Sequence, residues 1–204
     1  MTPLRLALLA DGSSDHALLR VIEWTLRAQH SNLPISEPGF EVRHGDLGEA
    51  VRDVIRVHRP HLVFVHRDAE TEALAVRRGE IPEIQHPLVR VVPVRMTEAW
   101  LLIDEGAIRL AAGNPNGKMA IALPPPATLE SIPNPKALLH SALVQASSTS
   151  GRRQKRFRRD LGLAVQRVAE YVDDFSVLRA LEAFRAFETD CREVLCSVLE
   201  QLDS

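Results

Sequence analysis

The segment HLVFVH at residues 61–66 is a nearly unbroken apolar run with β-branched and aromatic side chains. A strand that faces solvent on one side alternates apolar and polar residues, whereas a central strand of a parallel sheet is covered on both faces and is apolar throughout. The run therefore predicts a central parallel strand. Because parallel strands are joined by helical crossovers, this feature favours an α/β architecture with helices packed on a sheet.

The rest of the first hundred residues alternates between strand-like and helix-like patterns. Besides the central run, strands are expected over residues 4–10, 40–43 and 88–94, and helices over residues 18–26 and 47–58. Ser13 or Ser14 is the expected N-cap of the first helix, and Pro93 favours a strand end or a sheet edge for the last strand. This order predicts an α/β, Rossmann-like fold in which a mostly parallel four-stranded sheet is flanked by helices.

The second hundred residues have a mainly helical pattern. Helices are expected over residues 97–104, 135–146, 161–172 and 175–202, with a loop rich in Gly, Pro and Asn between residues 113 and 135. The last of these helices carries an apolar stripe that could pack against the sheet or serve a dimer. We therefore divide the 204 residues into an α/β core, residues 1–105, and a mainly helical C-terminal part, residues 106–204, packed on it.

Composition and charge restrict where this protein acts. The formal charge is −2 at pH 7, so no overall charge draws the protein to DNA, RNA or a membrane, and any polyanion site must be local. The apolar segment near the N-terminus is too short for a signal sequence or a membrane span. The only cysteines, Cys191 and Cys196, do not share a helix face, which argues against a disulfide. These features predict a cytoplasmic protein in a reducing compartment.

Acidic side chains follow three of the expected strands. They are Asp11 and Asp15 after the first strand, Asp68 and Glu70 after the central strand, and Glu98 after the last strand. Ligands of open α/β sheets bind outside the carboxyl ends of the strands, so these acids are expected to lie together there. We call this edge of the sheet the rim. Alternate residues of an extended segment point the same way, and His66, Asp68 and Glu70 share a face if the central strand stays extended.

Carboxylates that converge at one rim repel one another unless a cation or protons lie between them. Oxygen ligands of this kind suit Mg²⁺ or Mn²⁺, which is the expected cofactor. The candidate metal ligands are Asp11, Asp15, Asp68, Glu70 and Glu98. The histidines have no zinc-type spacing with the cysteines, so a zinc site is not expected.

The motifs around these acids resemble a known domain. A strand that ends in Asp11-Gly12, a Ser14-Asp15 pair and a hydrophobic strand that ends in the acid-x-acid pattern resemble the Toprim domain of topoisomerases, primases and several nucleases. The segment TEAWLLID at residues 97–104, with the sequence NPK at residues 134–136, is similar to a narrower group, the bacterial DUF4276 family of Toprim-like proteins. The resemblance covers about residues 4–190 and implies metal-dependent phosphoryl transfer on nucleic acid, with several relatives associated with defence.

The resemblance also implies roles for individual residues. Asp11 corresponds to a glutamate of the Toprim pattern that acts as a metal or acid–base residue, and Glu98 corresponds to the glutamate of the family's E-A-W motif. Asp15, Asp68 and Glu70 correspond to the remaining acids. Asp11 is shorter than the family glutamate, and His66 replaces a frequent aspartate. Either departure is expected to weaken Mg²⁺ binding, to shift the preference toward Mn²⁺ or to mark a degenerate site.

The hypothesis from the residues is an in-line attack of water on a phosphodiester. Asp11, Asp68 and His66 are the candidate catalytic residues: Asp68 and Glu70 hold metal, and Asp11 acts as ligand or general base. His66 or Arg67 is expected to stabilise the leaving oxygen or to grip phosphate.

A basic run stands out in an otherwise acidic chain. Six cations fall within eight residues: Arg152, Arg153, Lys155, Arg156, Arg158 and Arg159. The run is expected to contact a nucleic-acid backbone, although a solvated segment or an interface with an acidic partner protein is also consistent with it.

Two hypotheses from different classes remain open. One is a metal-dependent nuclease or phosphotransferase, and the other is a non-catalytic Toprim-like module that binds nucleic acid or a partner protein. Carboxylates of Asp11 and Asp68 that can share an ion favour the enzyme. An Asp11 or Asp68 held in an ion pair with Arg67 or Arg95 favours the binding module.

Overall fold

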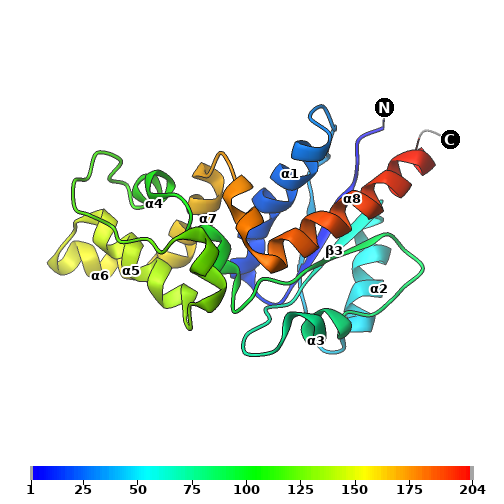
Figure 1. Ribbon diagram of the computed structural model, residues 1–204, viewed down its shortest axis with the longest axis horizontal. Helices are drawn as coiled ribbons and strands as arrows, with labels where there is room; N and C mark the ends of the chain where they lie inside the picture. The colour runs from blue at the N-terminus through cyan, green and yellow to red at the C-terminus, as the bar shows by residue number, and fades with distance from the viewer. Residues whose placement is uncertain (1, 203–204) are drawn as a thin grey trace.

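The computed structural model describes residues 2–202 and contains one four-stranded parallel sheet (Figure 1). Its strands are β1 (Leu6–Ala10), β2 (Gly39–Val42), β3 (Leu62–His66) and β4 (Leu88–Val91), in the order β2-β1-β3-β4. Every residue of the two central strands is buried, whereas β2 and β4 at the edges are only partly covered. The predicted α/β fold is therefore confirmed, including the central position of β3 and the edge position of β4.

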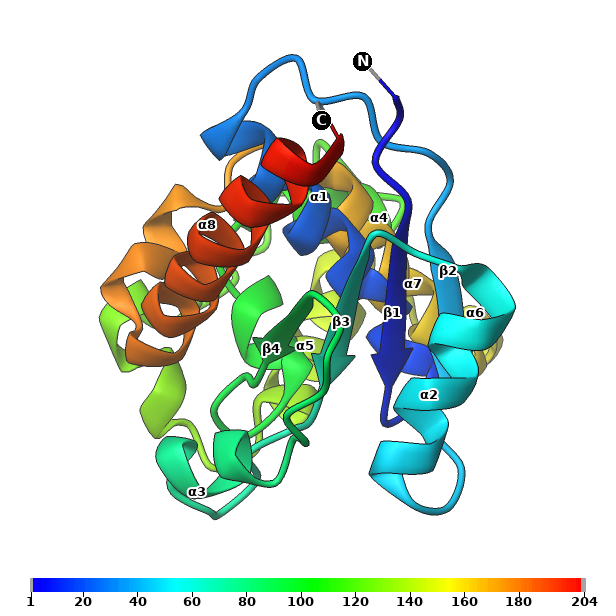
Figure 2. The same ribbon diagram turned by 90° about the vertical axis from the view of Figure 1, so that its right-hand side faces the viewer.

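Helices cover both faces of the sheet (Figure 2). On one face, α2 (Leu47–His58) packs against β1 and β3, and α3 (Leu74–Gly79) lies at the margin. On the other face lie α1 (Leu18–Gln29) and α8 (Glu182–Leu202), and α8 contacts both β4 and α1. The apolar stripe of α8 is therefore buried within the chain rather than free for a dimer.

The remaining helices form a part that extends to the left of the sheet in Figure 1. They are α4 (Glu105–Ala111), α5 (Pro135–Ser147), α6 (Gly151–Arg159) and α7 (Leu161–Tyr171). Four 3-10 segments join the elements: η1 (Ser13–Ala17), η2 (Thr97–Leu101), η3 (Pro126–Ser131) and η4 (Ser176–Ala180). Because α7 packs against η1 and α5 against η2, this helical part adjoins the carboxyl ends of β1 and β4.

An aromatic cluster connects η2 with α8 and the sheet. Trp100 of η2 is fully buried, and its ring centroid lies 5.4 Å from that of Phe184 and 5.7 Å from that of Phe187, both on α8. Phe187 in turn lies 6.4 Å from Phe64 at the centre of the sheet. Aromatic rings at such distances bury much apolar surface, so η2 is fixed at the end of β4.

Several boundaries differ from the sequence prediction for local reasons. Ser13 and Ser14 lie inside η1, and Gly12 is its N-cap, because the Asp15 carboxylate accepts a hydrogen bond from Gly12 N at 2.8 Å. The helix expected over residues 97–104 is the 3-10 segment η2, and Asp104 caps the next helix by accepting from Ala107 N at 3.0 Å. The helix expected over residues 175–202 is divided into η4 and α8.

Cys191 is buried, Cys196 is exposed, and both are free thiols. Within residues 2–202, no helix combines the length and the apolar character that crossing a membrane requires.

Candidate metal centre

Three side chains meet at the carboxyl ends of the neighbouring strands β1 and β3. Asp15 lies on η1 directly after β1, His66 is the last residue of β3, and Asp68 follows two residues later. Each offers one ligand atom, and the three atoms lie within 4.8 Å of one another. We call Asp15, His66 and Asp68 the metal cluster, because together they could hold a metal ion.

Hydrogen bonds fix the geometry of the metal cluster. His66 Nε2 lies 3.0 Å from Asp68 Oδ1, and His66 Nδ1 lies 3.5 Å from Asp15 Oδ2. Thr97, the first residue of η2, donates its backbone N–H to Asp68 Oδ1 at 3.0 Å and places its hydroxyl 3.2 Å from His66 Nε2. Residues that end or follow β1, β3 and β4 therefore hold the cluster together.

Burial and charge favour a bound proton at two residues of the cluster. Burial lowers the pKa of His66, but the hydrogen bond and charge of Asp68, together with Asp15 and Asp11, outweigh it and raise that pKa above its ordinary value. Burial also raises the pKa of Asp15, more than the nearby His66 lowers it. The folded protein thus takes up protons at the position where a cation would neutralise the same carboxylates.

The donor set fits a small divalent ion. Ligands about 2.0–2.1 Å from such an ion lie up to about 4.2 Å apart, so small side-chain shifts would complete the coordination. The cluster combines two carboxylates with one imidazole, and no cysteine belongs to it. Imidazole is a better ligand for transition metals than for Mg²⁺, whereas carboxylates suit both Mg²⁺ and Mn²⁺. Asp68 keeps a 24% exposed side chain while His66 is completely buried, so the open side of the cluster is at Asp68.

Asp11 lies beside the metal cluster but is bound to two arginines. Its Oδ1 accepts from Arg43 Nε at 2.8 Å, and its Oδ2 accepts from Arg67 Nε at 3.1 Å. Burial raises the pKa of Asp11, but these arginines and His66 outweigh it and lower that pKa. Asp11 is therefore a charged ion-pair partner of Arg67, which is the arrangement expected of a binding module.

Glu70 and Glu98, the other expected ligands, point elsewhere. The chain turns after Ala69, where Glu70 adopts a left-handed conformation with φ 53° and a 68% exposed side chain. Glu70 Oε2 lies 3.9 Å from Arg77, and the buried Glu98 lies 3.3 Å from Lys136 Nζ on α5. The structure therefore brings together Asp15, His66 and Asp68, and it does not bring Glu70 or Glu98 into this group.

The basic run forms the helix α6, which has no buried residue. Its six cations are exposed, and none forms an ion pair with any residue between 2 and 202. Phe157 and Gln154 face inward, with Phe157 packed against the core. The helix α6 therefore presents a basic surface at the end of the helical part that lies farthest from the sheet (Figure 1).

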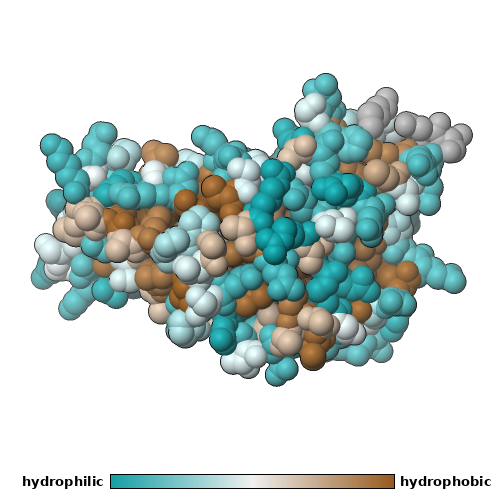
Figure 3. All heavy atoms as spheres, viewed as in Figure 1, coloured by the Kyte–Doolittle hydropathy of each residue, from teal (hydrophilic) through white to brown (hydrophobic). Residues whose placement is uncertain are grey.

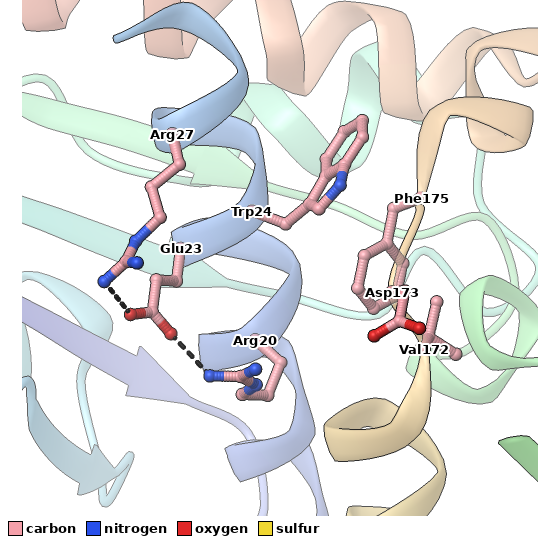
Figure 4. Close-up of a pocket in the computed structure, with 7 residues that line it drawn as sticks. All are labelled: Arg20, Glu23, Trp24, Arg27, Val172, Asp173 and Phe175. Carbon is pink, nitrogen blue, oxygen red and sulfur yellow. Dashed lines mark hydrogen bonds and ion pairs between the residues drawn. The ribbon is translucent and has the colours of Figure 1, made fainter. Parts of the chain in front are cut away.

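Other surface features offer less chemistry. A hollow of about 160 Å³ between α1 and residues 172–175 is lined by Trp24 and Phe175, and it shares no residue with the metal cluster (Figure 4). The Glu23 carboxylate at its rim is bound by both Arg20 and Arg27. Apolar side chains reach the surface in Figure 3 among hydrophilic ones. The large exposed apolar residues are spread over several elements, with two of them on α7: Val57, Val76, Leu110, Met119, Leu163, Tyr171 and Val177.

Comparison of the chain with protein-family models, with curated proteins and with solved structures gives no match. The assignment of chemistry therefore depends on the site itself.

Two residues of the site were not identified from the sequence. Thr97 was assigned no role in the site, although it begins η2, which follows β4 and lies at the same edge of the sheet. Arg43 follows β2 in the same way and reaches Asp11 across the strand pair. His66 was expected at the leaving oxygen or at a phosphate, whereas its complete burial places it behind the carboxylates, in the position of a metal ligand.

Proposed function

We propose that this protein is a divalent-metal-dependent enzyme that transfers phosphoryl groups on nucleic acid, as a nuclease or a related phosphotransferase. The observation that carries the proposal is the convergence of Asp15, His66 and Asp68 donor atoms at the carboxyl ends of β1 and β3. The resemblance to Toprim-like proteins of the DUF4276 family, and with it a role in bacterial defence, belongs to the same proposal.

The side chains of the cluster have different exposures, which suggests different roles. A divalent ion bound there would neutralise phosphate charge and lower the pKa of a bound water. Asp15 and His66 would hold it from the buried side, and Asp68 from the side that faces solvent. Thr97 fixes the orientation of Asp68 through its backbone N–H. We favour Mn²⁺ over Mg²⁺ because one of the three ligands is an imidazole.

We infer a nucleic-acid substrate from the positive charge on α6 and beside the metal cluster. The cations of α6 are exposed and unpaired among the described residues, and Arg67 lies beside the metal cluster. A polyanion with a regular spacing of phosphates could engage both surfaces, and each contacted phosphate adds affinity by counterion release.

Cleavage assays test this proposal. Single- and double-stranded DNA and RNA are incubated with the protein and Mn²⁺ or Mg²⁺, and wild type is compared with Asp68→Asn. Loss of a metal ligand should reduce cleavage by more than about 100-fold, since even residues that only support ligands cost 10–100-fold. The matched control is Asp53→Asn, an exposed acid paired with Arg56 on α2, which should cleave like wild type. Equal cleavage by Asp68→Asn would show that the activity comes from elsewhere.

The second candidate is a non-catalytic module that binds nucleic acid or a partner protein. The observation in its favour is the ion pairing of Asp11 with Arg43 and Arg67, which removes one acid from the expected metal site. Absence of cleavage with every substrate and metal, combined with retained nucleic-acid binding, would favour this candidate.

A further inference from the structure

Asp11 forms ion pairs with two arginines, and these arginines follow two different strands. Arg43 follows β2, Arg67 follows β3, and Asp11 follows β1, which lies between them in the sheet. Each carboxylate oxygen of Asp11 accepts from one guanidinium Nε, at 2.8 Å from Arg43 and 3.1 Å from Arg67. Two converging guanidinium groups with a small two-oxygen anion between them are the arrangement that recognises a phosphate group.

This arginine pair is accessible and adjoins the metal cluster. The side chains of Arg43, Arg67 and Asp11 are 29%, 17% and 25% exposed, so a ligand can reach them from solvent. The backbone N–H of Asp11 donates to His66 Nδ1 at 3.4 Å. A group bound by the two arginines would therefore lie next to the metal cluster.

Arg43 and Arg67 make other contacts that hold them in place, but these contacts do not neutralise the charge of both arginines. Arg43 donates to the carbonyl oxygen of Gly45 at 3.1 Å, and Arg67 also pairs with Glu80 at 3.2 Å. Glu80 is in turn bound by Arg77 at 2.8 Å. Asp11 is thus the only carboxylate shared by Arg43 and Arg67 among the ion pairs of residues 2–202.

We propose that Arg43 and Arg67 form a phosphate-binding site beside the metal cluster, and that Asp11 fills this site until a phosphate displaces it. Arg43 is thereby a substrate-binding residue, and Asp11 is an internal competitor rather than a permanent structural partner. The inference rests on the proposed function only in taking the phosphate to be part of a nucleic acid.

Phosphate titrations without metal test the proposal. Inorganic phosphate and a dinucleotide with one internal phosphodiester are added to the 204-residue chain, and binding is followed by the NMR signals of the arginine Nε–H groups. Asp11→Asn removes the competing charge and should tighten phosphate binding by about 10-fold. Arg43→Gln in the Asp11→Asn background should abolish this gain.

The matched control is Glu70→Gln, which also removes one negative charge near the rim but does not release Arg43 or Arg67. A gain in Asp11→Asn no larger than that in Glu70→Gln would overturn the proposal, because general electrostatics would then explain it. The titration of the wild-type protein does not depend on whether any variant folds. In the wild type, the NMR signals of Arg43 and Arg67 should shift together when phosphate is added. An unchanged Arg43 signal would also overturn the proposal.

The two ligands separate the sources of phosphate. A response to the dinucleotide supports a nucleic-acid ligand, whereas a response to inorganic phosphate alone would overturn that link. The titration also separates this inference from the proposed function. A protein that binds the dinucleotide through Arg43 but cleaves nothing retains the phosphate site and loses the enzymatic proposal.

Discussion

His66 Nε2 lies 3.0 Å from Asp68 Oδ1, and this contact joins the buried imidazole to the partly exposed carboxylate of the metal cluster. A neutral imidazole with its proton on Nε2 donates to Asp68, while its Nδ1 accepts the backbone N–H of Asp11. The cluster is therefore satisfied by a proton in the absence of an ion. An ion ligated by either ring nitrogen must break one of these hydrogen bonds, and this competition has measurable consequences.

The first prediction concerns stabilisation by metal. Mn²⁺ at about 100 times its dissociation constant should raise the free energy of unfolding by about 2.7 kcal/mol, because the ion binds only the folded cluster. For a chain of this size that corresponds to an increase in Tm of roughly 5–10 °C. Asp15→Asn and Asp68→Asn should each remove the increase, measured by thermal denaturation with and without the metal.

The control for metal binding is Asp53→Asn, since Asp53 is an exposed acid on α2, away from the cluster residues. Its metal-dependent shift in Tm should equal that of wild type. An equal shift in Asp68→Asn would mean that the ion binds outside the cluster.

The second prediction concerns pH. The pKa of His66 in the folded protein lies above its unfolded value near 6.5, so the folded state binds this proton more tightly than the unfolded state does. The resulting stabilisation is fully present below pH 6.5 and is lost as pH rises through the folded-state pKa. Metal-free wild type should therefore lose Tm above pH 6.5, and His66→Gln should flatten this decline. A wild-type Tm that rises across the same range would contradict the assignment.

The sequence is sufficient to predict which segments reach the rim but not which side chains pair there. The apolar run in β3 and the acids after three of the four strands are local features, so the parallel sheet and the position of Asp68 were predictable. Glu70 was misplaced because the backbone turns at that residue, with φ 53°, instead of remaining extended. The pairing of Arg43 with Asp11 depends on the register of β1 against β2, which no local pattern encodes.

The third prediction separates Glu98 from the metal cluster. The Glu98 side chain is 6% exposed and its carboxylate lies 3.3 Å from Lys136 Nζ, so Lys136→Met leaves a buried charge without this partner. We expect a loss of about 1–3 kcal/mol in the free energy of unfolding, measured in urea. Adding Glu98→Gln to Lys136→Met should recover part of the loss. Lys118→Met, at an exposed lysine, is the control and should cost little.

Glu98→Gln alone should leave the Mn²⁺-dependent increase in Tm unchanged, since Glu98 is bound to α5 rather than to the cluster. A reduced increase in this variant would instead make Glu98 a metal ligand, as the sequence pattern suggested.

The fourth prediction concerns the basic surface of α6. Arg153→Glu combined with Arg156→Glu should weaken nucleic-acid binding at low salt. If each arginine contacts one phosphate, the slope of log affinity against log salt should fall in magnitude by about 2. The measurement is fluorescence anisotropy with a labelled oligonucleotide over a series of salt concentrations. Both residues are exposed and make no ion pair within the described chain, so the free energy of unfolding should hardly change.

The matched control is Arg52→Glu combined with Arg56→Glu on α2. It makes the same change in net charge, also at two exposed positions of a helix. If binding depends on α6 itself, the control should keep the salt slope of wild type. Equal losses in both double variants would show that the oligonucleotide responds only to the total charge of the protein. In that case α6 is a solvated helix, and the nucleic-acid substrate would depend on the arginines beside the metal cluster alone.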